Sequence, residues 1–201
     1  MGATFVLPLY PLEETVLLPG ATLKVAPPPG WLAGIVGSAR AFGGAVVASL
    51  VDGDSVHEVG VTAILESTDE PRPALRGVTR CRLLELMPTD SPLVRAERYP
   101  EPRPPRNPRS LAQLLSRRYE RLCERVARPA SPGGGPPADL SGLTWQITAA
   151  LGLSAEQQQG FLNVPDAMTR GRLLLVAVRE LERRERFLRP WAHLRTECSW
   201  N

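Results

Sequence analysis

The sequence is poor in several residue types on which enzyme chemistry depends. Lys24 is the only lysine, and His57 and His193 are the only histidines. The chain therefore lacks both a phosphate-binding loop of the G-x-x-x-x-G-K-[ST] kind and a helical motif with two metal-binding histidines. No G-x-S-x-G turn presents a serine nucleophile. We therefore expect no enzymatic activity and no bound cofactor or metal ion.

Cysteines and long hydrophobic runs are also scarce. Cys81, Cys123 and Cys198 are odd in number and far apart, which is typical of a reducing compartment. No run approaches the roughly 20 apolar residues that span a membrane. The segment Phe5–Val25 is apolar, but three prolines and an acidic pair interrupt it, unlike a secretion signal. We expect a cytoplasmic protein that does not associate with membranes.

The first half of the chain has the pattern of short strands bounded by proline and glycine. Cys81 falls within one of them, where we expect a buried, inert thiol. A short helix at about Trp31–Ala41 interrupts the set. This spacing predicts a small barrel or sandwich of mixed strand order. The predicted strands are Phe5–Tyr10, Thr22–Val25, Ala45–Leu50, Val59–Glu66, Leu75–Leu86 and Leu93–Tyr99.

The second half has a helical period. A proline- and arginine-rich linker, residues 101–110, separates the predicted β domain (residues 1–100) from a helical bundle (residues 111–189). Within the bundle, Ser154 and Gln157 form a capping box that opens a helix. A short tail, residues 190–201, follows. The fold class predicted is therefore α+β, with strands first and helices second.

Charge divides along the same boundary. Residues 1–94 hold six basic and ten acidic residues, a net charge of −4, whereas residues 95–201 hold eighteen basic and eleven acidic residues, a net charge of +7. The basic segment Arg95–Arg128 has ten arginines against four acids, which suits phosphates. Glu120 and Glu124 alternate with its arginines at helical spacing, however, which is more typical of a salt-bridged solvent face.

Several segments resemble the N-terminal domain of Lon proteases. "LPLYPLEETVLLPG" follows the family's opening pattern L-P-L-x-P-L-x-x-x-V-L-x-P-G. "LRGVTRCRLLEL" is similar to its G-x-x-R-x-R-I-x-E-L strand, and "LNVPDAMTRGRL" to its L-x-x-x-D-x-x-x-R-L helical segment. In the opening stretch, Pro8 and Pro11 predict an edge-type strand, and Pro19-Gly20 predicts the turn into the next strand.

The resemblance implies a PUA-like mixed β-barrel followed by a helical bundle. It also implies a role in recognising substrate polypeptides and in oligomer assembly. The Walker motifs are absent, and the family's Ser–Lys peptidase dyad would have only Lys24 to draw on. We therefore expect a stand-alone bacterial Lon-domain protein without proteolytic activity.

Two functional hypotheses follow. The first is a non-catalytic module, an adaptor, regulator or scaffold, that binds unfolded or partner polypeptides in an apolar groove between the two domains or at a strand edge. The second is RNA binding by the barrel and segment 95–128, which the net acidic charge of residues 1–94 disfavours. Self-association into a homo-oligomer stays open. The candidate partner-binding residues are Trp31, Phe42, Trp145, Trp191 and Trp200.

Overall fold

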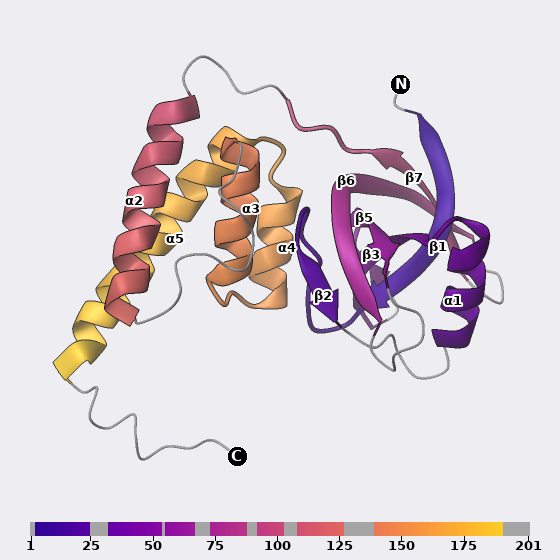
Figure 1. Ribbon diagram of the computed structural model, residues 1–201, viewed down its shortest axis with the longest axis horizontal. Coiled ribbons are helices and arrows are strands. Elements are labelled where there is room, and N and C mark those ends of the chain that lie inside the picture. Colours follow the sequence, from indigo (N-terminus) through magenta and orange to yellow (C-terminus); the bar gives the residue numbers. More distant parts are fainter. Residues whose placement is uncertain are drawn as a thin grey trace.

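The chain folds into a sheet lobe and a helical lobe. The computed structural model describes residues 3–24, 32–53, 55–66, 73–87, 92–102, 108–126 and 139–190. Residues 3–102 form the sheet lobe, in which one helix accompanies the strands, and residues 108–190 form the helical lobe (Figure 1). The predicted α+β class, with strands first and helices second, is confirmed. Within the described residues, no helix is long and apolar enough to cross a bilayer.

The strands match the predicted apolar segments closely. They are β1 (Thr4–Leu12), β2 (Thr22–Lys24), β3 (Ala45–Asp52), β4 (Ser55–Val56), β5 (Val59–Leu65), β6 (Ala74–Met87) and β7 (Leu93–Arg98). Helix α1 (Leu32–Ala41) lies between β2 and β3. Only the two-residue strand β4 was not predicted, because its hairpin with β3 is too short to produce an alternating pattern.

The strands form one mostly antiparallel sheet. Neighbours follow the order β1-β7-β6-β5-β3-β4, and β2 pairs with β6. The exception to the antiparallel rule is the pairing of β1 with β3, which is parallel. Because β3 pairs with β1, the series of paired strands that begins at β1 also returns to it. The path β1-β7-β6-β5-β3 is therefore closed by hydrogen bonds.

The edge-type character predicted for β1 is found in each half separately, because each half pairs with one neighbouring strand only in the described sheet, but the two halves pair with different strands. Its first half, Thr4–Pro8, pairs with β7, and its second half, Leu9–Leu12, pairs with β3. Pro8 is the last residue in register with β7, so the strand changes partners where a proline lacks the N–H donor. Pro8 therefore marks a change of partner inside the sheet.

The turn between β1 and β2 depends on two glycines. Gly20 has φ of 78°, a conformation that glycine adopts without strain, so the predicted turn at Pro19-Gly20 is confirmed. Gly77 of β6 exchanges hydrogen bonds with this turn, donating to Ala21 O and accepting from Gly20 N. A Cβ at Gly77 would collide with the carbonyl oxygen of Leu18. The absence of a side chain there lets the turn pack directly on β6.

The helical lobe contains α2 (Pro108–Val126), α3 (Leu140–Ala150), α4 (Ala155–Asn163) and α5 (Ala167–Leu188). Helix α2 begins three residues before the predicted start of the bundle. The predicted capping box is confirmed: Ser154 Oγ accepts from Gln157 N, and Gln157 Oε1 accepts from Ser154 N. Asp139 and Asp166 cap α3 and α5 with one such bond each, because their carboxylates accept from Gly142 N and Thr169 N.

One packed core joins the two lobes, and another lies within the helical lobe. One lies inside the sheet, with Tyr10, Val61 and Leu75 among its members, and it also includes Trp145 of α3 and Leu162 of α4. The other lies among α2, α3 and α5 and includes Leu115, Leu174 and Val178. Because helical residues complete the sheet's core, we expect the two lobes to stabilise each other.

Candidate functional site

The structure places the predicted aromatic residues in different surroundings. Trp31, Trp191 and Trp200 lie outside the described residues. Phe42 follows α1 and is 39% exposed, whereas Trp145 is 6% exposed in the core shared by sheet and helices. Helices α1 and α3 lie on opposite sides of the sheet (Figure 1). Phe42 and Trp145 therefore do not belong to one site, and three other places have features of a binding site.

The first place is the junction of the lobes, where Arg80 of β6 enters the helical lobe. Its Nη1 donates to the carbonyl oxygens of Leu162 and Val164 at 2.9 and 2.6 Å, and its Nη2 donates to Pro165 O at 2.8 Å. The last carbonyls of a helix have no partner within the helix. Arg80 therefore closes the C-terminal end of α4 while it remains part of the sheet.

A second buried arginine completes the junction. Arg170 of α5 is fully buried, donates to Thr144 Oγ1 at 2.8 Å, and pairs with Glu101 at 2.5 Å. Its guanidinium lies 3.5 Å from the centre of the Trp145 ring. Burial lowers the pKa of Arg170 to about 10, and the charge of Glu101 opposes that shift. Arg170 therefore stays charged at neutral pH, where its partners compensate it.

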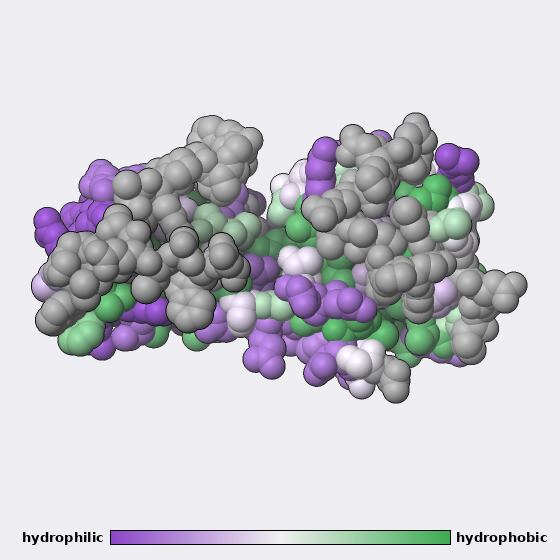
Figure 2. Space-filling model, turned by 90° about the horizontal axis from the view of Figure 1, so that it is seen from below, coloured by the Kyte–Doolittle hydropathy of each residue, from purple (hydrophilic) through white to green (hydrophobic). Residues whose placement is uncertain are grey.

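A hollow of about 320 Å³ opens at this junction, with Arg80 in its lining. Val78 and Tyr99 line it together with polar groups of Thr79, Glu101 and Ser141. The guanidinium of Arg80 already binds carbonyls and a carboxylate of the protein. Figure 2 shows that the molecule narrows between the lobes. The predicted groove between the domains therefore corresponds to a small, partly polar hollow beside a structural cluster.

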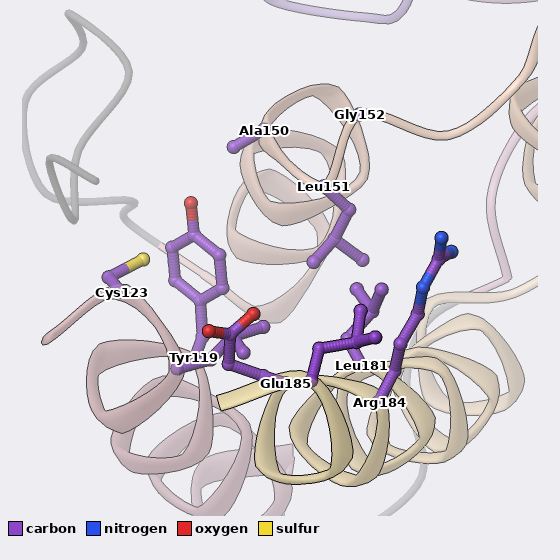
Figure 3. A pocket seen from close by; sticks show the side chains of 10 residues that line it. Tyr119, Cys123, Ala150, Leu151, Gly152, Leu181, Arg184 and Glu185 are labelled. Carbon is purple, nitrogen blue, oxygen red and sulfur yellow. The ribbon is translucent and has the colours of Figure 1, made fainter. Parts of the chain in front are cut away.

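The second place is a pocket of about 340 Å³ at the end of the helical lobe. It exists because Gly152, with φ of 65°, turns the chain away after α3 while α2 and α5 continue. Figure 3 shows Tyr119 and Cys123 on one wall, Leu151 opposite, and Glu185 beside the Tyr119 ring. Arg184 extends along the other wall. The pocket contains no histidine, and among the described residues no three His, Cys, Asp or Glu side chains gather as metal ligands would.

The third place is the far end of β6. The pairing with β5 ends at Val59–Arg82, and Leu83 N makes a last bond to Glu58 O. Beyond this bond β6 continues to Met87 with β7 on one side only, within the described part of the chain. A bulge between Leu83 and Glu85 leaves Leu84 without a partner in the register. One edge of the last four residues of β6 is therefore not paired in the described sheet.

Apolar side chains accompany this edge. Leu84 and Leu86 are 47% and 48% exposed, and both line the same small hollow. This hollow, of about 150 Å³, is also bordered by Val56, Leu83 and Val94. Glu85 pairs with Arg95 of β7 at 2.6 Å, so the other side of the strand end is held in place. We call Leu84–Met87 the β6 edge.

Comparisons with known proteins concern the fold. No protein-family model matches the sequence, and no curated protein sequence matches it. The structure is similar to the N-terminal domain of Lon protease from the Mycobacterium avium complex, with a TM-score of 0.70 at 19% sequence identity, over 87% of this chain and 98% of that one. The chain has a Lon N-terminal domain fold.

A second structure gives the same result. The Lon N-terminal domain protein from Xanthomonas campestris aligns with a TM-score of 0.62 at 21% identity, over 86% of this chain and 98% of that one. Both comparisons cover the sheet lobe and the helical lobe together, so the arrangement of the two lobes is shared with the Lon N-terminal domain fold.

Sequence reasoning missed the residues that join the lobes. Arginines are mostly surface residues, so composition gave no reason to expect Arg80 and Arg170 inside. Both occupy arginine positions of the quoted Lon patterns, Arg80 in the strand pattern and Arg170 in the helical one. The signal that could have identified them was therefore their place in those patterns.

Proposed function

We propose that this chain is a non-catalytic polypeptide-binding module that takes up an extended segment of a client or partner protein at the β6 edge. The observation that carries the proposal is a strand end with one unpaired edge and two exposed leucines. An added strand would satisfy the free backbone groups, and the leucines would supply apolar contacts. Soluble proteins usually protect exposed edges with charges, bulges or short strands, and the β6 edge, although short and bulged and carrying Glu85, still exposes two leucines that an added strand could cover.

The fold supports this proposal. The closed path of strand pairing agrees with a PUA-like barrel, the arrangement that the resemblance to Lon N-terminal domains implies. The same resemblance implies recognition of substrate polypeptides without ATPase or peptidase activity. As a protein that binds polypeptides but does not process them, the chain would act as an adaptor, regulator or scaffold.

The test measures binding of a reduced, carboxymethylated and fluorescently labelled polypeptide by anisotropy. We expect Leu84→Ser/Leu86→Ser to weaken binding about tenfold or more, because both leucines would be covered in the complex. Leu114→Ser on α2 is the matched control, since Leu114 is equally exposed at 44% but lies in the other lobe. Equal binding by all three proteins would contradict the β6 edge as the site.

RNA binding is the competing outcome. If a single-stranded RNA bound instead, with an affinity that falls steeply as salt rises, the polypeptide proposal would be wrong. Circular dichroism on every variant separates loss of binding from loss of fold, and substitution of exposed leucines is not expected to unfold the protein.

A further inference from the structure

The outer face of α5 carries apolar side chains that the fold does not cover. Leu173, Leu174, Leu175 and Val176 are consecutive, and four consecutive helical residues spread around most of the helix. Leu174 and Leu175 are buried, whereas Leu173 and Val176 are 45% and 54% exposed. A helix that only covers a core is expected to be polar on its far side. This helix is apolar on two sides.

The exposed residues form a continuous stripe. Starting from Leu173, steps of three or four residues lead through Val176, Glu180 and Arg184 to Phe187, which is 74% exposed. Fourteen residues separate the ends of the stripe, a distance of about 21 Å along the helix. We call Leu173, Val176, Glu180, Arg184 and Phe187, with the flanking Arg172 and Arg183, the α5 outer face.

The charge of this face favours an acidic partner. Arg172, Arg183 and Arg184 are exposed, and Glu180 is the single acid of the face. Glu180 is bound by Arg183 at 3.0 Å, on the surface. Two copies of the chain that met through this face would bring these arginines together, which disfavours self-association. RNA would match the positive charge of this face. Its bases would, however, have only Phe187 of the face to stack on, and Leu173 and Val176 offer no aromatic ring.

We infer that the α5 outer face binds an acidic amphipathic helix of a partner protein. Such a helix would need about four turns, with apolar residues at steps of three and four that pack on Leu173, Val176 and Phe187. Asp or Glu residues along its flanks would meet Arg172, Arg183 and Arg184. This site is in the helical lobe and is separate from the β6 edge, so each can be tested without the other.

The test uses the full chain and a labelled synthetic helix of alanine, leucine and glutamate, 15 residues long, with leucines at steps of three and four. Two further peptides serve as comparisons: one with lysine in place of glutamate, and one with the same composition in scrambled order. We expect the acidic helix to bind at least about tenfold more tightly than either.

Variants then locate the site. We expect Leu173→Ser/Val176→Ser and Arg183→Glu/Arg184→Glu each to weaken binding of the acidic helix about tenfold. Leu84→Ser/Leu86→Ser and Arg40→Glu, both in the sheet lobe, are the matched controls and should leave it unchanged. All of these side chains are exposed, so the fold is expected to tolerate the changes.

Three outcomes would overturn the inference. Equal binding of the acidic and scrambled peptides would show that the face does not recognise an amphipathic helix. Loss of binding only in Leu84→Ser/Leu86→Ser would place the peptide at the β6 edge, which would leave the proposed function intact. Displacement of the peptide by single-stranded RNA of 15 nucleotides, sensitive to Arg183→Glu/Arg184→Glu but not to the serine variants, would assign the face to nucleic acid.

Discussion

A single buried charge, the guanidinium of Arg170, helps to hold the two lobes together through its ion pair with Glu101. Arg170 has no exposure to solvent and is held by Thr144, Ser141 and Glu101 around the Trp145 ring. We expect Arg170→Met to lower the free energy of unfolding by about 3 kcal/mol, because Glu101 would lose its closest charge partner. Urea unfolding followed by circular dichroism measures this change.

The exposed pair of Arg183 and Glu180 provides the matched control. Arg183→Met removes an ion pair of 3.0 Å between residues that are 75% and 60% exposed. Such pairs contribute little, so we expect a change below about 0.5 kcal/mol. A loss as large as that of Arg170→Met would show that burial is not the cause.

The buried phenol of Tyr10 and the buried thiol of Cys81 predict that the protein loses stability at high pH. Burial raises the pKa of Tyr10 from 10.0 to about 12 and that of Cys81 from 9.0 to about 12. In the unfolded chain both groups lose their protons at lower pH, so the folded state holds more protons between about pH 9 and 12. The stabilisation is complete below pH 9 and falls as pH rises through this range.

Urea unfolding between pH 8 and 11 measures that effect, and Tyr10→Phe should reduce the slope by removing one titrating group. An unchanged slope in this variant, or constant stability up to pH 11, would contradict the burial of these two side chains. The predicted inert state of Cys81 agrees with its complete burial.

At the level of elements, the start of α5 depends on its cap. Asp166 accepts a hydrogen bond from Thr169 N at 2.8 Å, and this bond lowers the pKa of the Asp166 carboxyl. We expect Asp166→Ala to destabilise the protein by about 1 kcal/mol, whereas Asp166→Asn keeps an acceptor and should cost less. Thermal unfolding at pH 7 compares them. Equal losses would show that the charge and not the acceptor is what matters.

Sequence patterns predicted most elements but not their pairing. The β6 segment was predicted at Leu75–Leu86 and found at Ala74–Met87, because its apolar residues and flanking turns are local signals. That β1 leaves β7 for β3 at Pro8 is decided by contacts between distant segments, which local patterns do not contain. The sequence suggested a strand edge as a binding site but not its location, because the β6 edge exists only where pairing with β5 stops at Val59–Arg82 while pairing with β7 continues to Leu93–Met87.

In the whole molecule, the two lobes are joined by a common core but present different surfaces to solvent. The sheet lobe presents the β6 edge, and the helical lobe presents an arginine-rich surface. In the described part of α2, Arg118 and Arg125 both pair with Glu182 of α5. The sequence predicted ion pairs within α2, but these two arginines form ion pairs with another helix instead. These two arginines of α2 are therefore paired within the bundle, which disfavours the RNA hypothesis for that segment.

Hydrogen–deuterium exchange on the full chain, with and without the carboxymethylated polypeptide, is the direct test of strand addition at the β6 edge. We expect slower exchange within Leu84–Met87 when the polypeptide is bound, because carbonyl groups of an added strand would accept hydrogen bonds from the N–H groups on the edge that does not face β7. Amides in the centre of α3 should keep their rates. Protection confined to the junction hollow or the helical lobe, with unchanged exchange at Leu84–Met87, would contradict strand addition at the β6 edge.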